Sequence, residues 1–505
     1  MGGRCHLIEG PVGAAIYDLP NRKVWTVPAL IRQVLLDCAG GSPLEVSLRR
    51  IPRIAAMPAA YDVIRTFALH HPALRLVSRR GAGLWPLPIT RVYEPRALGL
   101  EITNGCNLQC RHCYVACGPA PSDNGPPAQP DDRSPLPTAR WLDLLEEARA
   151  LGFESLVLTG GEPTLHPDLA LLLRKAHRLR FRPIELLSNL LRLDDALIAL
   201  LRRIGARVQT SVYADHAEAH DAVTGLAGSF ARTIGGIERL LAAGVQTRVN
   251  VVSIDHNPAA SRRIQAFLTG LGVGPDDVTL GRPVPIGRAA DLVENLRRSV
   301  RARTFGPLCV RQGKLLVNSC LAGKAAIDTG GDVYACLLER APLGNVAGAP
   351  LRAVIDSPAM QQLWQIRLEN IPGCSQCEFR YACADCRGFA HALSGNLLGR
   401  DPSCPYNPLT GQWHYEGLEM NEKPRRKDGF IVEEMDGDLL LANFQQSQMH
   451  VLNPIAAVIW DMCDGLQTVE AIVDTLAAHF NSPAQDIRRD VDQILAEFRA
   501  KGLIE

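Results

Sequence analysis

The chain has 505 residues, of which 47% are hydrophobic and 21% charged, and its formal net charge is +1. This length exceeds what one hydrophobic core supports, so we expect roughly three or four domains. The near-neutral charge provides no general attraction to nucleic acid or to a membrane. No apolar run approaches the ~20 residues that span a bilayer, and the first ten residues lack the pattern of a signal peptide, so we expect a cytoplasmic protein.

The fifteen cysteines are numerous for a protein of a reducing compartment. Because thiols stay reduced there, a disulfide framework is not expected and the cysteine spacing indicates metal sites. Eleven of the cysteines fall into two groups along the chain, and Cys5, Cys38, Cys117 and Cys463 show no partnering pattern.

The N-terminal segment, residues 1–94, is predicted to be a small α+β domain. Residues 14–28, AAIYDLPNRKVWTVP, have the pattern of a β-hairpin, and residues 29–38 have the pattern of a helix. No internal repeat is evident in the sequence.

Residues 95–298 alternate short apolar runs with amphipathic stretches. The runs are LGLEIT, SLVLT, IELLS, VQTSV, RVNVV and DVTL. Six such units predict an α/β fold, a partial (β/α)6 TIM-like barrel with its chemistry at the carboxyl ends of the strands. One inserted loop, residues 118–137, is rich in proline, glycine and acid, and it fits a disordered insertion as well as a mobile lid.

Three cysteines, Cys106, Cys110 and Cys113, follow the first of these strands with spacings of three and two residues. One loop with this spacing can wrap three thiolates around an iron-sulfur cubane and leave its fourth iron open. Taken alone, the triplet leaves a zinc site or an incidental pattern open.

The next strand runs directly into Gly160, Gly161, Glu162 and Pro163. CxxxCxxC followed one strand later by GGEP resembles the radical S-adenosylmethionine (SAM) superfamily. The resemblance implies a [4Fe-4S] cluster on the three cysteines and a GGEP segment that receives the amino group of SAM. It also implies SAM contacts at Ser188, Asn189 and Ser211, which lie at later strand ends.

The implied chemistry is the transfer of one electron to bound SAM, which releases methionine and a 5'-deoxyadenosyl radical that abstracts a substrate hydrogen. An electron donor such as a flavodoxin or ferredoxin is then a required partner. No acid or histidine in the sequence can be singled out as a general base.

A second cysteine group follows in residues 299–414, a predicted α+β cysteine-rich extension. Its members are Cys320, Cys336, Cys374, Cys377, Cys383, Cys386 and Cys404. Their order, with Gly331 in place, resembles the SPASM extension, which binds one or two auxiliary [4Fe-4S] clusters. A zinc-ribbon-like module is the alternative.

By position in that pattern, Cys374, Cys377, Cys383 and Cys404 would hold one auxiliary cluster. Cys320, Cys336 and Cys386 would hold the other, with Cys309 as a possible fourth ligand. Cys386 lies one residue early compared with the usual spacing, a variation that also occurs in haem-biosynthesis members and in some peptide-modifying members.

The last segment, residues 425–505, has three short strand patterns and helices beginning near Asn453, Thr468 and Ser482, a winged-helix-like order. From Asp428 to Glu505 there are 14 acidic and 4 basic residues, a formal charge of −10, which would repel DNA. The segment resembles PqqD, a peptide chaperone. That family binds a leader peptide as an extra strand on an exposed sheet edge.

The combined expectation is a radical SAM/SPASM maturase that modifies, and is expected to crosslink, a ribosomally synthesised precursor peptide whose leader binds residues 425–505. A radical SAM enzyme acting on a small molecule such as a tetrapyrrole is the alternative. A non-catalytic peptide-binding scaffold ranks last because the cysteine triplet and GGEP are both present.

Overall fold

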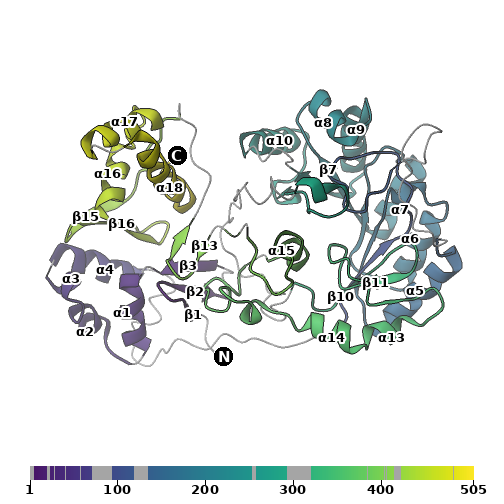
Figure 1. The fold of residues 1–505 in the computed structure, drawn as a ribbon, viewed down its shortest axis with the longest axis horizontal. Coiled ribbons are helices and arrows are strands. Elements are labelled where there is room, and N and C mark those ends of the chain that lie inside the picture. The colour runs from purple at the N-terminus through teal and green to yellow at the C-terminus, as the bar shows by residue number, and fades with distance from the viewer. Residues whose placement is uncertain are drawn as a thin grey trace.

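The computed structural model describes residues 5–19, 23–27, 29–39, 41–56, 58–70, 94–118, 135–252, 258–292, 320–383, 385–402, 404, 406–413, 422–480 and 483–505. In Figure 1 the two ends of the chain form neighbouring units at one side of the molecule, and residues 97–281 form a strand-and-helix body at the other. The cysteine-rich extension starts beside this body and reaches from it toward the two terminal units.

Six parallel strands form the predicted partial barrel, paired in sequential order as β4-β5-β6-β7-β8-β9. They are β4 (Ala97–Glu101), β5 (Ser155–Thr159), β6 (Ile184–Leu187), β7 (Arg207–Val212), β8 (Gln246–Val252) and β9 (Val278–Gly281). The α/β class and all six predicted strands are confirmed. The inserted loop of residues 118–137, apart from its ends, lies outside the described residues.

Helices connect these strands and cover the sheet. They are α5 (Thr138–Leu151), α6 (Leu169–Arg178), α7 (Asp195–Ile204), α8 (Ala217–Thr224), α9 (Ser229–Ala242) and α10 (Pro258–Gly270), with short 3-10 turns at Pro163–Leu165, Pro275–Asp277 and Gly287–Leu292. Leucines of α5 and α6 pack on the apolar strands in one continuous core. The polar ends of the strands therefore stay free for a site.

The cysteine-rich extension continues the barrel sheet. Its strand β10 (Lys324–Ile327) pairs in parallel with β4, and β11 (Asp332–Tyr334) and β12 (Gly344–Asn345) add antiparallel strands to make nine in total. The remaining elements are α13 (Leu351–Ile355), α14 (Pro358–Trp364), a 3-10 turn (Leu368–Asn370), α15 (Arg387–Ser394), β13 (Tyr406–Asn407) and β14 (Gln412–Trp413). The buried Trp364 belongs to the barrel core, so barrel and extension share one interior.

The N-terminal unit is a three-stranded antiparallel meander followed by helices. Strands β1 (Cys5–Glu9), β2 (Ala14–Asp18) and β3 (Lys23–Val27) pair in order, so the structure contains the predicted hairpin and one further strand. The helices are α1 (Ala29–Ala39), α2 (Leu44–Arg49), α3 (Pro52–Ala55) and α4 (Pro58–His70).

The C-terminal unit has the predicted winged-helix-like order. It contains β15 (Ile431–Met435), β16 (Asp438–Asn443), β17 (Gln448–Leu452), α16 (Pro454–Met462), α17 (Val469–Phe480) and α18 (Ala484–Lys501). The side chain of Asn453 caps α16 by accepting a hydrogen bond from the N–H of Ala456, at 2.8 Å. Helices α16 to α18 cover one face of the sheet in a separate core.

The other face of the C-terminal sheet packs against the N-terminal unit. Met435, Leu440, Ala442 and Met449 are buried in the same core as the residues of α1, α2 and α4. In the same way the far face of the N-terminal sheet packs on the extension, where Tyr17 lies with the aromatic residues Phe379, Tyr381 and Tyr406. The two ends of the chain are therefore joined to each other and to the extension through buried apolar side chains.

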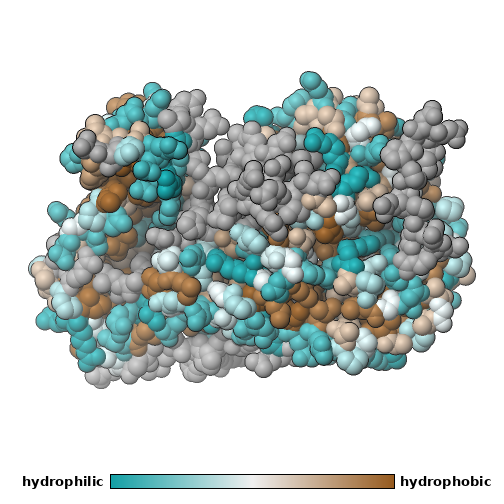
Figure 2. Space-filling model, viewed as in Figure 1, coloured by the Kyte–Doolittle hydropathy of each residue, from teal (hydrophilic) through white to brown (hydrophobic). Residues whose placement is uncertain are grey.

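Among the described residues no helix is both long and apolar enough to cross a membrane. Figure 2 shows a viewed face that is largely hydrophilic, with apolar residues gathered in separate patches.

The shared core predicts that the two terminal units stabilise each other. We expect Leu440→Ala, which removes a fully buried side chain from this core, to cost about 2–5 kcal/mol and to speed hydrogen exchange in α4. Leu441→Ala is the matched control, since Leu441 is equally buried but faces α16 to α18. Equal exchange rates in α4 for the two variants would contradict the shared core.

Candidate functional site

The predicted SAM and cluster residues lie where neighbouring parallel strands end. The cysteine triplet follows β4, the GGEP segment follows β5, and Ser188 and Asn189 follow β6, while Ser211 is the penultimate residue of β7. Carboxyl ends of adjacent parallel strands meet at one edge of the sheet, which is where barrel enzymes place their chemistry. The fold therefore brings these four segments to one rim.

The loops after β4 and β5 are held together by their backbones. The N–H of Gly161 donates to the carbonyl of Thr103 at 2.7 Å, and the N–H of Glu162 donates to the carbonyl of Gly105 at 2.8 Å. A Cβ on Gly160 or Gly161 would lie 2.4 or 2.2 Å from those carbonyl oxygens, and Gly160 has a φ of +127°. In this structure both glycines are needed for the contact between the two loops.

The carboxylate of Glu162 is buried and joins its own loop, after β5, to the loop after β6. Its Oε1 accepts hydrogen bonds from the N–H and hydroxyl of Thr164, at 3.1 and 2.6 Å, and from the hydroxyl of Ser188, at 2.7 Å. Its Oε2 accepts from the N–H of Asn189 at 2.7 Å. Burial raises the pKa of Glu162, and these hydrogen bonds lower it. The side chain that the family pattern assigns to SAM thus also fixes the loop after β6.

The thiols of the triplet share their surroundings with a fourth thiol. The Sγ atom of Cys117 lies 3.6 Å from that of Cys113, and Cys117 is buried. A hydrogen bond from Cys117 lowers the pKa of Cys113 to about 6, whereas burial and the neighbouring thiolates raise the pKa of Cys110 to about 12. The sequence pattern gave no sign of this neighbour, because CxxxCxxC ends at Cys113.

Two helical segments hold the cysteine loop in place. The N–H of Gln109 donates to the carbonyl of Thr224 at the end of α8, at 2.9 Å. The Nε of Arg288 donates to the carbonyl of Cys110 at 2.8 Å, and a Cβ on Gly287 would lie 2.4 Å from the carbonyl oxygen of Tyr114. Sequence reasoning missed Gly287 and Arg288, although their position just after the last barrel strand could have indicated them.

Ser211 sits beside the same loop through Tyr213. The hydroxyl of Tyr213 interacts with Ser211 and Cys110, and its burial raises the pKa of Tyr213 well above the ordinary value. The ring of Tyr213 packs edge-on against His112, with centroids 4.8 Å apart, and the N–H of Tyr213 donates to Nδ1 of His220 at 3.4 Å. His220 is therefore part of the packing that supports the loop.

The seven cysteines of the extension lie in two groups. Cys320 is hydrogen-bonded to Cys386 and electrostatically coupled to Cys336. The second group contains Cys374, Cys377, Cys383 and Cys404, in which the charges of Cys383 and Cys404 raise the pKa values of Cys374 and Cys377. The structure thus brings together the thiols that the sequence pattern grouped, while Cys309 lies outside the described residues.

A charge pair between the buried Glu101 and the partly buried Arg340 connects the barrel with the first of these groups. Glu101, the last residue of β4, accepts a hydrogen bond at 2.9 Å from Arg340, which follows Cys336 by four residues. Arg340 stacks on the ring of Tyr334 at 4.4 Å, and the Tyr334 hydroxyl donates to Asp328 at 2.8 Å. Burial raises the pKa of Glu101 although Arg340 lowers it. The first strand of the barrel is thereby tied to the hairpin that carries Cys336.

Within the described residues, no three His, Cys, Asp or Glu side chains converge closely enough for a single metal ion. The cluster assignment therefore rests on the donor set: three thiols on one loop and seven in two groups, the ligand type that iron-sulfur clusters require.

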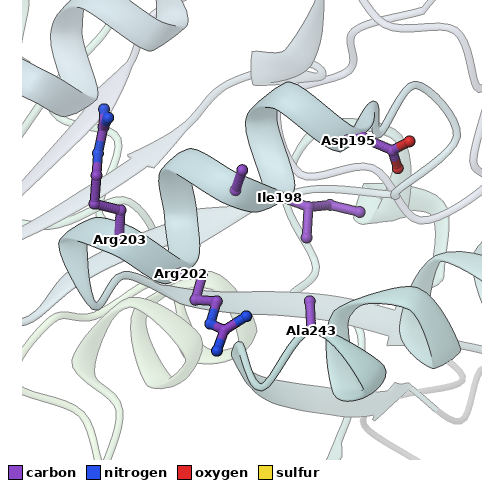
Figure 3. Close-up of a pocket in the computed structure, with 6 residues that line it drawn as sticks. Asp195, Ile198, Arg202, Arg203 and Ala243 are labelled. Atoms are coloured by element: carbon purple, nitrogen blue, oxygen red, sulfur yellow. The ribbon is translucent and has the colours of Figure 1, made fainter.

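The pocket in Figure 3 is separate from these residues. It is lined by side chains of α7, including Ile198 and Arg202, and by Ala243 after α9, on the outer helical layer.

Comparison with known proteins identifies three parts of the chain. Residues 100–260 match the model of the Radical SAM superfamily, residues 320–378 that of an iron-sulfur cluster-binding domain (SPASM), and residues 438–504 that of coenzyme PQQ synthesis protein D (PqqD). The chain is a radical SAM enzyme with a SPASM extension and a PqqD domain.

Several curated proteins are similar over most of their own length. An AdoMet-dependent heme synthase of Methanosarcina barkeri is 25% identical over 63% of this chain and 99% of its own. The mycofactocin maturase MftC of Mycobacterium ulcerans is 27% identical over 61% and 88%. The PqqA peptide cyclase of Gluconobacter oxydans is 26% identical over 65% and 96%. Both of the activities weighed from the sequence thus occur among its relatives.

The cysteine loop predicts a sharp difference between two neighbouring thiols. Cys110→Ala should lose one cluster, about four iron and four sulfide per chain, because three thiolates are the protein ligands of that cubane. It should also produce no 5'-deoxyadenosine with SAM and dithionite. Cys117→Ala is the control and should keep both properties. Deoxyadenosine formation by Cys110→Ala would refute the assignment.

The Glu162 contacts predict a loss of SAM affinity. Glu162→Gln should weaken SAM binding about tenfold or more, because an amide NH2 replaces one of two oxygens that accept hydrogen bonds from buried donors. Ser188→Ala, which removes one of those bonds, should have a smaller effect. Calorimetric titration of the reconstituted enzyme with SAM measures both, and an unchanged dissociation constant for Glu162→Gln would remove its role.

Proposed function

We propose that this enzyme modifies a ribosomally synthesised precursor peptide, with a crosslink as the product, and that the leader of the peptide docks on the C-terminal unit. The observation that carries the proposal is a PqqD domain in the same chain as the radical SAM site. A relative named PqqA peptide cyclase acts on a peptide by its name, and this supports the same substrate class.

In the proposed site, Cys106, Cys110 and Cys113 hold a [4Fe-4S] cluster, and the rim formed by Gly160–Pro163, Ser188, Asn189 and Ser211 holds SAM. The cluster and SAM together supply a 5'-deoxyadenosyl radical. The protein's own part is orientation: Glu162 fixes the loops after β5 and β6, while Arg288 and Gln109 fix the cysteine loop. Such positioning accounts for much of what a cofactor enzyme contributes.

The two thiol groups of the extension would hold auxiliary clusters, and these would accept the second electron of a net oxidation. Cys374, Cys377, Cys383 and Cys404 form one proposed set. Cys320, Cys336 and Cys386 form the other, with Cys309 as its possible fourth ligand. A flavodoxin or ferredoxin is the proposed donor for the radical-generating cluster, in a reducing compartment such as the cytoplasm.

The edge of the C-terminal sheet at β17 suits strand addition. Asp436 and Gly437 both have positive φ and form the tight two-residue turn of the β15–β16 hairpin, whose closing pair is hydrogen-bonded. In an antiparallel sheet, the N–H groups of successive residues point alternately toward one neighbouring strand and away from it. Counting from the closing pair through β16 to β17, the N–H groups of Met449 and Val451 point away from β16. A peptide strand can pair with these two groups.

Two buried polar atoms on β17 lack partners among the described residues, namely Oε1 of Gln448 and Nε2 of His450. Leaving such atoms unsatisfied costs about 1–3 kcal/mol each, which a bound peptide would recover. Burial lowers the pKa of His450 to about 3, and the charge of Lys501 at the end of α18 adds to this. The imidazole of His450, on β17 and near the end of α18, is therefore a neutral hydrogen-bonding group.

A tetrapyrrole or other small molecule is the second candidate, because a heme synthase is among the relatives. A free strand edge with unsatisfied polar atoms has no evident use for such a substrate. Deletion of residues 425–505 is a poor test between the two, since it would expose the core shared with the N-terminal unit. Point substitutions on the edge strands avoid that difficulty.

Val451→Pro removes one outward N–H from β17 without breaking the sheet's own ladder. It should weaken binding of the precursor peptide about threefold to tenfold, the value of one hydrogen bond. Val432→Pro is the matched control, since its N–H points outward from the opposite edge strand, β15. Fluorescence anisotropy of labelled precursor measures both affinities. Equal affinities for the two variants would contradict docking on β17.

A further inference from the structure

The N-terminal unit is a second copy of the fold of the C-terminal unit. Ala14 pairs with Val27 as Leu439 pairs with Leu452, and 439 − 14 and 452 − 27 both equal 425. Leu7 pairs with Ile16 as Val432 pairs with Leu441, with the same difference of 425. Because the residue numbers differ by the same 425 in both hairpins, the strands of the two meanders pair in the same register.

The helices follow the same shift. Helix α1 begins at Ala29 and α16 at Pro454, and α2 begins at Leu44 and α17 at Val469, each 425 residues later. Buried positions correspond too, since Ile31, Val34, Leu35 and Cys38 of α1 match Ala456, Ile459, Trp460 and Cys463. Helix α4 falls within the residues equivalent to Pro483–Leu495, where α18 lies. The correspondence needs no insertion or deletion.

The two units also use equivalent faces to pack. Ala15 and Tyr17 of β2 face the extension, and their equivalents Leu440 and Ala442 of β16 face α4 of the N-terminal unit. The N-terminal sheet therefore packs on the extension, and the C-terminal sheet packs on the helices of the N-terminal unit. The arrangement is a head-to-tail stack of two like units.

The free edges of the stack differ in their surroundings. The β1–β2 hairpin is fixed to the extension, since the Tyr17 hydroxyl donates to the carbonyl of Glu378 at 2.8 Å and the Glu378 side chain fills the space beside Gly10 at the tip. Arg380 reaches the carbonyl of Glu9 on β1. Edge β1 is thus partly engaged by the extension.

Edge β3 is in the position that β17 has in the other unit. The N–H of Gly10 donates to the carbonyl of Gly13, which identifies this as a hydrogen-bonded pair of the β1–β2 hairpin. Because N–H groups alternate in direction along an antiparallel strand, those of Val24 and Thr26 on β3 then point away from β2. Among the described residues neither N–H has a hydrogen-bond acceptor. Natural sheets protect such edges with charges, bulges or covering elements. β3 has one charged residue, Lys23, at its start.

We infer that β3 is a second strand-addition edge, which binds a second extended segment of the same precursor peptide. The inference rests on the proposed function, since it assumes that a peptide docks on the equivalent edge β17. We assign both edges to one precursor because the two units share a single core, which fixes edge β3 and edge β17 relative to each other. A peptide strand needs only the main-chain pairing that both edges offer.

The test is hydrogen–deuterium exchange of the full-length reconstituted enzyme with and without its synthetic precursor peptide. We expect added peptide to slow exchange in residues 23–27 and 448–452, at one peptide per chain. Protection of 448–452 alone would overturn the second edge and leave the proposed function standing. Protection of neither segment would overturn both. Two peptides per chain would overturn the single-precursor occupant.

Matched substitutions separate docking on β3 from an indirect effect. Thr26→Pro removes an outward N–H at the position equivalent to Val451, and we expect it to weaken precursor binding about threefold to tenfold and to abolish protection of residues 23–27. Leu7→Pro, on the opposite edge, is the control and should leave both unchanged. Circular dichroism confirms that each variant is folded. Full affinity and full protection in a folded Thr26→Pro variant would overturn the inference.

Discussion

Backbone hydrogen bonds between the loops after β4 and β5 are the constraint on which the radical site depends. The carbonyls of Thr103 and Gly105 accept from Gly161 and Glu162, so the cysteine loop and the GGEP segment form one surface. The Glu162 carboxylate extends that surface to the loop after β6. Three strands thereby deliver thiols, backbone donors and a buried acid to one rim, a preorganisation that a reactive intermediate requires.

The same principle of joining distant segments governs the rest of the molecule. Strand β10 extends the barrel sheet, so the extension begins as a continuation of the barrel. Glu101 and Arg340 add a charge pair between β4 and the hairpin that carries Cys336. Further on, Tyr17 packs the N-terminal unit on the extension, and Leu440 packs the C-terminal unit on the N-terminal one. A continuous series of buried contacts runs from the radical site to the proposed peptide edges.

The parts that sequence predicted and those that it missed differ in physical kind. Period-2 and period-3.6 patterns predicted the six barrel strands and the C-terminal helices, because burial of one face imposes those periods. Short motifs predicted the cysteine loop and GGEP, because ligand chemistry limits the residues at those positions. Arg288 was missed because its role depends on a contact between distant segments, which leaves no local pattern. Cys117 was missed for a different reason, since it contacts Cys113 within one loop but lies outside the CxxxCxxC spacing. The sequence also did not predict that buried cores join neighbouring domains, as the core shared by the two terminal units does.

The likeness of the terminal units was hidden for a related reason. At the shift of 425 residues only a few identities remain, among them Cys38 with Cys463 and Gly40 with Gly465. A meander covered by helices needs apolar residues at given positions, but it does not need a particular amino acid at each of them. Two units of this fold can therefore share their hydrogen-bond register and have few identical residues.

The shared core also changes how docking would raise the rate of modification. If the C-terminal unit were tethered by a flexible linker, the protein linker would set the effective concentration of the peptide at the barrel. Here Met435, Leu440, Ala442 and Met449 fix that unit against its neighbour. The flexible connection must then be the peptide itself, between its docked segment and its reacting residue. The length of that stretch, and not a protein hinge, would decide which residue reaches the radical site.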